Sequence, residues 1–248
     1  DIMANGKQQG KALLKEALTI LAVLLGTGLV LVSIFLISRC DGRGNDAPPV
    51  HSATVSDVAV TDTETGISYT RCPIGIGANT LKDKFLAIGD EDSGIVLYTI
   101  MFEDSARFIS EAKDALGGSY VYRAKGEKEI TLEGFAPIAA GIFMDGINAP
   151  IDNFYGKDAV DNATGLKLED GTKYVEYIKN ALLNGKQATP TGEFTDTEYY
   201  IRLYSKAYPG LYYEVLFCTD VNGVAYLRDM VTEKLVVSPD ELTVRING

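Results

Sequence analysis

Two side chains stand at the spacing of a serine and lysine catalytic pair. Ser110 and Lys113 form an S-x-x-K sequence. On a helix, residues three positions apart share a face, so the lysine could activate the serine as a nucleophile. An apolar stripe over 106–116, preceded by Asp104-Ser105 as a cap, predicts such a helix. The later K-T-G sequence expected with this pair is missing, and a pattern this short often arises by chance. Ser110 and Lys113 are therefore only candidates.

Acidic loops raise the question of calcium binding. Asp90 and Asp92 lie together in a polar loop, and 145–170 holds six more carboxylates. Carboxylate oxygens are the ligands that Ca²⁺ prefers. Neither stretch matches an EF-hand loop, which needs a glutamate at its twelfth position. Asp90 and Asp92 are metal candidates, and solvated loop charge is the simpler alternative.

The sequence gives little reason to expect catalysis or zinc binding by histidine. The only histidine is His51, which falls in the polar linker predicted over 39–52. Ser-His-Asp and Cys-His catalysis and a His/Cys zinc site all need a folded histidine. No P-loop is present, and Gly75–Gly77 lacks the rest of a dinucleotide fingerprint. The sequence predicts no cofactor and favours a protein that is not an enzyme.

Cys72 and Cys218 could form a disulfide if this part of the chain is exported. Both cysteines also sit among apolar residues, where a free thiol behaves as a small buried hydrophobe. They are 146 residues apart, so their spacing favours neither alternative.

Residues 17–38 predict a transmembrane helix. They contain no charged residue, and 22 residues at about 1.5 Å each cross a hydrocarbon core of about 30 Å. The stretch is longer than the core of a signal peptide, and Arg39-Cys40-Asp41 is a poor cleavage site, so we expect a retained anchor. Three lysines precede it and two arginines follow it closely, which favours a cytoplasmic N-terminus and an exported remainder.

Small residues within this span suggest contact with another helix. Ala22 and Gly26 form a small-xxx-small pair, which lets a second transmembrane helix approach closely. Glycine is also common in membrane helices without such a contact. Ala22 and Gly26 are the predicted helix-packing residues.

The net charge of residues 41–248 limits the classes of molecule that this part of the chain could bind. Residues 41–248 carry 19 Lys and Arg against 32 Asp and Glu. This acidity argues against nucleic acid and against lying flat on anionic lipid. It fits a soluble surface, a basic partner or bound cations.

The pattern of apolar residues predicts an α+β fold with a mostly antiparallel sheet and two or three helices. Strands are expected over 53–61, 66–72, 95–102, 119–124, 129–135, 198–206, 211–219, 224–230 and 234–237. Helices are expected over 106–116 and 172–183 and from 238, and 137–143 predicts a short helix or a buried loop. Asn222-Gly223 indicates a type I′ hairpin. Seven tyrosines between 199 and 226 are typical of sheet core or of a partner surface.

The predicted organisation is a cytoplasmic segment 1–16, the span 17–38, the linker 39–52, an exported region 53–190 and a β-meander 191–248 in the same domain. The leading hypothesis is a membrane-anchored, non-catalytic binding or scaffold protein of the cell envelope or a membrane complex. It would contact lipid through 17–38 and a protein partner or further copies of itself. One alternative is an envelope hydrolase using carboxylates or the Ser/Lys pair. Another is a pilin-like filament subunit, since Gly10, Lys11 and Glu16 are loosely similar to such a processing site.

Overall fold

Strands dominate the structure, a computed structural model that describes residues 50–56, 59–76, 80–88, 95–111, 120–144, 149–157, 159–161 and 166–247. Of these residues, 46% lie in strands and 15% in helices. The predicted α+β class was wrong: the described part is mostly β, and it contains a closed barrel of seven strands. The segments 1–16 and 17–38, with Ala22 and Gly26, lie outside the described residues.

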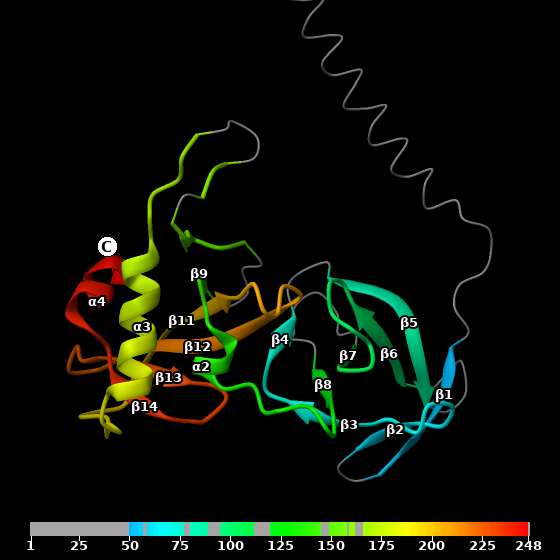
Figure 1. The fold of residues 1–248 in the computed structure, drawn as a ribbon. Helices are drawn as coiled ribbons and strands as arrows, with labels where there is room; N and C mark the ends of the chain where they lie inside the picture. The colour runs from blue at the N-terminus through cyan, green and yellow to red at the C-terminus, as the bar shows by residue number, and fades with distance from the viewer. Residues whose placement is uncertain are drawn as a thin grey trace, which may run out of the picture. The chain divides into compact units, whose positions relative to one another are not determined.

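The barrel is built from the N-terminal strands of the described part (Figure 1). Its neighbours run in the order β1-β2-β3-β8-β7-β6-β5, and β5 closes on β1. Every pair is antiparallel except β1 with β5, which is parallel. The strands are β1 (His51–Val55), β2 (Val60–Asp62), β3 (Ser68–Cys72), β5 (Leu81–Ile88), β6 (Ile95–Ile100), β7 (Phe108–Glu111) and β8 (Val121–Ala124).

Side chains fill the barrel interior. Successive residues of a strand point to opposite faces, so each strand sends alternate residues inward. The interior cluster comprises Val60, Tyr69, Leu86, Leu97, Ile109 and Ala124, all buried. The barrel is therefore a packed core.

Strand β7 replaces part of the helix predicted over 106–116. Asp104 does form a turn, in which its carboxylate accepts from the Ala106 amide at 2.9 Å, but a strand follows. Phe108 and Ile109 are both buried, the first in the main core and the second inside the barrel. Burial of consecutive residues on opposite sides is typical of a strand, whose successive side chains point to opposite faces, whereas on a helix they lie only about 100° apart.

The second sheet is formed mostly by the C-terminal half of the chain. Its strands run in the order β10-β9-β11-β12-β13-β14, and β4 (Gly75–Ile76) pairs with the first two residues of β12. All its pairings are antiparallel. The strands are β9 (Ala139–Met144), β10 (Asp152–Phe154), β11 (Phe194–Tyr204), β12 (Leu211–Asp220), β13 (Ala225–Asp229) and β14 (Leu235–Val237). Strand β9 occupies the stretch predicted as a short helix or buried loop.

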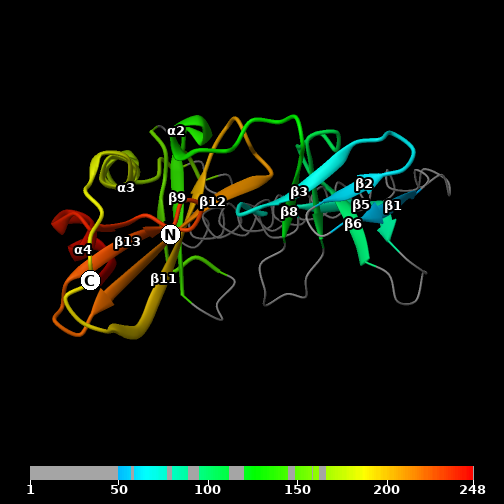
Figure 2. The ribbon, with the colours of Figure 1, turned by 90° about the horizontal axis from the view of Figure 1, so that it is seen from below.

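Three helices of the described part cover one face of this sheet. They are α2 (Leu132–Phe135), α3 (Thr172–Asn184) and α4 (Asp240–Asn247). Figure 2 shows α2 and α3 on the same side of the strands. Each helix contributes to the main core: Leu132, Phe135, Val175, Ile178, Leu182 and Leu242. The short helix α2, capped by the Thr131 side chain, stands where a strand was predicted over 129–135.

Described strands from both sides of residue 190 lie in one sheet. Residues 48–248 form one compact unit, because β11 pairs with β9 on one side and β12 on the other. Strand β1 also begins inside the predicted linker 39–52. No helix of the described ranges is long and apolar enough to cross a bilayer.

Candidate functional site

His51 belongs to the barrel and not to a tether. It is the first residue of β1 and pairs with Leu86 of β5. Its imidazole lies against the Phe85 ring, with 5.3 Å between ring centroids, and 19% of its side chain is exposed. The sequence-based assignment to a linker was wrong, because the contacts that hold His51 come from residues distant in sequence.

Asp62 organises the turn beside His51. It ends β2 and is fully buried. Its carboxylate accepts from the Glu64 amide at 2.9 Å and the Thr65 hydroxyl at 2.7 Å. Gly66 completes the turn with a φ of 73° and donates its amide to the Asp62 carbonyl at 2.9 Å. The sequence Asp-x-x-Thr-Gly thus closes the β2–β3 hairpin through local bonds.

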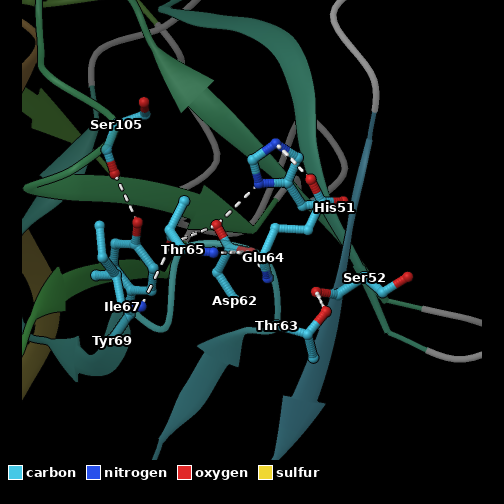
Figure 3. A network of polar contacts seen from close by, with 9 residues as sticks. All are labelled: His51, Ser52, Asp62, Thr63, Glu64, Thr65, Ile67, Tyr69 and Ser105. Atoms are coloured by element: carbon cyan, nitrogen blue, oxygen red, sulfur yellow. Dashed lines mark hydrogen bonds and ion pairs between the residues drawn. The ribbon is translucent and has the colours of Figure 1, made fainter.

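Two carboxylates face the two nitrogens of the His51 ring (Figure 3). Nδ1 lies 2.9 Å from Asp62 Oδ2, and Nε2 lies 3.5 Å from Glu64 Oε2. The hydrogen bond to Asp62 raises the His51 pKa, against a smaller opposing effect of burial. Burial alone would raise the Asp62 pKa, but the bonds from His51, Thr65 and two backbone amides outweigh it and lower this pKa to about 2.

This arrangement stabilises an imidazolium that donates from both nitrogens. A histidine acting as general base needs one unprotonated nitrogen aimed at a substrate. Here each nitrogen faces a carboxylate of the same hairpin. The group carries a charge that is lost as pH rises through the raised His51 pKa, and it ties β1 to the β2–β3 turn.

The polar groups around this pair are also bonded within the barrel. Thr63 donates to the Ser52 carbonyl from its hydroxyl at 2.8 Å and from its amide at 3.0 Å. Tyr69 donates to the Ser105 carbonyl at 2.9 Å, and burial raises its pKa to about 12, so it stays neutral. The contacts in Figure 3 therefore join β1 to the β2–β3 turn, and Tyr69 of β3 to the backbone at Ser105.

The structure has a strand at Ser110, where the predicted Ser110 and Lys113 pair required a helix. Ser110 lies in β7, is fully buried and donates to the Tyr120 carbonyl at 3.0 Å. Lys113 lies outside the described residues. Catalysis by this pair required both side chains on one helical face, and Ser110 stands on a strand.

Cys72 and Cys218 are both free, buried thiols. Cys72 ends β3 and packs in the main core, whereas Cys218 lies in β12 within a separate small cluster. Burial raises the pKa of both, that of Cys218 to about 11, so both stay protonated. Of the two alternatives that the sequence left open, the structure has the free buried thiols and no bridge between them.

Asp90 and Asp92 lie outside the described residues, as do Asp145 and Asp158. Within the described ranges, no group of three His, Cys, Asp or Glu side chains is placed to hold a metal. Two other acidic candidates have separate partners: Asp152 pairs with Arg245 at 3.0 Å, and Asp170 accepts from the Thr172 hydroxyl at 2.5 Å.

Two further buried aspartates, which the sequence reasoning missed, repeat the role of Asp62. Asp229 accepts from the Tyr213 hydroxyl, the Val231 amide and the Thr232 hydroxyl at 2.8–2.9 Å. Asp220 accepts from the hydroxyls of Thr191 and Tyr226, and it closes the Asn222-Gly223 turn. Only Gly223 of that turn has a positive φ, 82°, so it is not the type I′ turn predicted. The repeated D-x-x-T sequence at 62–65 and 229–232 was the signal available.

A shallow groove lies between α3 and α4. It has a volume of about 420 Å³. The Tyr174 ring stacks on Phe154 at 4.6 Å, and the Lys173 ammonium lies 4.7 Å from the Tyr174 ring centroid. Its lining comprises Lys173, Tyr174, Tyr177, Asp240, Glu241 and Val244. The groove offers aromatic area flanked by charge.

Comparison of the chain with protein-family models, with curated proteins and with solved structures gave no match. The function is therefore inferred from the residues and contacts described above.

Proposed function

We propose that this chain is a non-catalytic binding or scaffold protein of the cell envelope or of a membrane complex. In this proposal residues 17–38 hold it in a membrane, with the N-terminus cytoplasmic and the barrel and second sheet on the other side. The observation that carries the non-catalytic part is the position of His51 between two carboxylates.

Catalysis by acid, base or nucleophile needs groups that are bound by the fold yet free toward a substrate. The chain's only histidine is held by Asp62 and Glu64. Ser110 is buried and bonded to backbone. Asp62, Asp220 and Asp229 close hairpin turns. These side chains, although of reactive types, serve the fold, which supports binding over chemistry.

The charge of the chain and one surface groove support a binding role. The chain has a net charge of −11, so it favours basic protein surfaces over nucleic acid. The groove between α3 and α4 exposes Val244 to 72% beside two tyrosines and two carboxylates. Tyrosine rings and flanking charge are typical of protein contact surfaces.

Isolation of the full chain from its native membranes in mild detergent tests this function. After brief chemical cross-linking, we expect a stoichiometric partner or a homo-oligomer, and extraction with alkaline carbonate should leave the chain in the membrane pellet. The variant His51→Gln should retain the complex. A clean monomer, release by carbonate, or a hydrolytic activity that His51→Gln abolishes would each contradict the proposal.

A further inference from the structure

Strand β1 closes the barrel through a short pairing. Within the described ranges, only His51 and Ser52 of β1 pair with β5. Their partners are Leu86 and Ala87, and this pairing is the parallel one of the barrel. No residue of β1 is fully buried, whereas Leu86 is buried in the barrel interior. A segment with so few buried apolar contacts is expected to open locally at a low cost in free energy.

The same two residues of β1 are also held to the β2–β3 turn (Figure 3). Nδ1 of His51 lies 2.9 Å from Asp62 Oδ2. The Ser52 carbonyl accepts from the hydroxyl of Thr63 at 2.8 Å and from its amide at 3.0 Å. Because these contacts fix the position of residues 51–52, the pairing of β1 with β5 depends on the ion pair as well as on the backbone.

Protonation of the His51 ring determines the strength of this hold. The charged groups that face the ring are Asp62 of β2 and Glu64 of the turn, while Phe85 of β5 packs on it without a charge. An imidazolium donates to both carboxylates, but a neutral imidazole has one N–H and directs a lone pair at the second carboxylate. The hydrogen bond to Asp62, with the charge of both carboxylates, raises the His51 pKa from 6.5 when β1 is in place. The hold on β1 is therefore complete below about pH 6.5 and is lost as pH rises through the raised value.

We propose that the pairing of β1 with β5 is a pH-sensitive seam of the barrel. The seam is closed while His51 carries a proton and opens locally when His51 loses it. Opening separates residues 51–52 from 86–87, while 53–55 stay paired with β2. It exposes Leu86 and leaves an unpaired backbone edge on β5, the kind of edge that can accept another strand. The second sheet stays folded throughout.

Hydrogen exchange of the full chain in detergent micelles, followed by mass spectrometry, tests the seam at pH 5.5 and 8.5. With exchange rates corrected for the intrinsic effect of pH, we expect the protection of residues 50–56 to fall at least about threefold at the higher pH. This exchange should not depend on urea below the unfolding transition, since local opening exposes little surface. Strand β12, residues 211–220, is the reference for global unfolding, and its exchange should depend on urea.

Three variants determine whether His51 is the responsible group. His51→Gln should give the low protection of residues 50–56 at both pH values. His51→Lys stays charged at pH 8.5 and should give the high protection at both. The matched control Lys82→Gln removes an exposed cation of β5 and should keep the wild-type pH dependence. A pH dependence that survives in His51→Gln, seam exchange with the urea dependence of 211–220, or no difference between the two pH values in the wild type would overturn the proposal.

Discussion

Two hairpins of this molecule use the same turn with different third partners. Asp62 in the barrel and Asp229 in the second sheet each accept from the amides two and three positions on and from a threonine hydroxyl. The amide of each aspartate also closes the turn by donating to the carbonyl of the residue five positions on. The fourth residue after the aspartate has a positive φ in both turns, 73° at Gly66 and 60° at Glu233.

The third partner sets what each carboxylate can do. Asp229 accepts from Tyr213, which is fully buried and whose pKa is raised above its usual value by burial and by Asp229. The Tyr213 hydroxyl therefore stays neutral. Asp62 faces His51, whose ring is partly exposed and loses its charge as pH rises through its raised pKa. The same turn is therefore a fixed part of the core in one sheet and pH-sensitive in the other.

The largest effect is expected from removing the carboxylates. We expect Asp229→Ala to lower the free energy of unfolding by about 4 kcal/mol and Asp62→Ala by about 3 kcal/mol, since buried donors lose their acceptor. Asp229→Ala should cost more because Tyr213 has no access to water, whereas His51 does. Urea unfolding followed by circular dichroism measures both. The exposed Asp196→Ala is the control, and equal costs would contradict the contrast.

Removing only the third partner of Asp229 should have a smaller effect. Tyr213→Phe keeps the ring but deletes a hydroxyl bonded to a carboxylate, which we expect to cost about 2 kcal/mol. The same unfolding experiment applies. Tyr199→Phe, at the edge of the same core, is the matched control. A cost for Tyr213→Phe no larger than that of the control would show that Asp229 does not depend on this bond.

The two turns differ in the residue at the positive-φ position, which is Gly66 in one and Glu233 in the other. We expect this difference to change the free energy of unfolding by about 1 kcal/mol. A left-handed conformation is costly for residues other than glycine. Glu233→Gly should therefore stabilise the protein by about 1 kcal/mol, because the exposed ion pair with Arg228 that it removes contributes little. Gly66→Ala should destabilise it by a similar amount. If both substitutions shift the urea midpoint in the same direction, the two turns are not equivalent.

The smallest effect is a dependence on pH in the barrel hairpin. The His51 pKa is raised on folding, so its stabilising effect is complete below about pH 6.5 and is lost as pH rises through the folded value. The Asp62 pKa is lowered, so its effect is present above about pH 3.8 and is lost as pH falls toward about 2. His51→Gln should remove the loss on the alkaline side and reduce the loss on the acidic side, because His51 is one of the groups that lower the Asp62 pKa. Unfolding at pH 5, 7 and 9 checks this, and an unchanged slope in His51→Gln would contradict it.

Strands with strong apolar patterns could be read from the sequence, while short segments between turns could not. Ile95–Ile100 is continuously apolar, and Thr172–Asn184 repeats with the helical period, so both were predicted. Phe108 and Ile109 fit a helical stripe as well as a strand buried on both sides, and only the barrel decides between them. At 129–135, the capping hydroxyl of Thr131 outweighed an apolar alternation typical of a strand.

The candidate site was missed because its contacts join separate segments. His51 follows Pro48-Pro49 in a polar stretch, and nothing local indicates that Asp62 binds its ring. The aspartate turn itself could have been found, since Asp-Thr-Glu-Thr-Gly before an apolar strand is a local signal. Pairing of β1 with β5 also depends on distant residues.

The central claim is that His51 is a bound imidazolium and not a free base. The chain has one histidine, so labelling histidine with ¹⁵N in the full chain gives a single imidazole to titrate by NMR. We predict a pKa above 6.5 with both nitrogens protonated below it, returning toward 6.5 in Asp62→Asn. A pKa at or below 6.5, with Nε2 unprotonated at neutral pH and insensitive to Asp62→Asn, would contradict this claim.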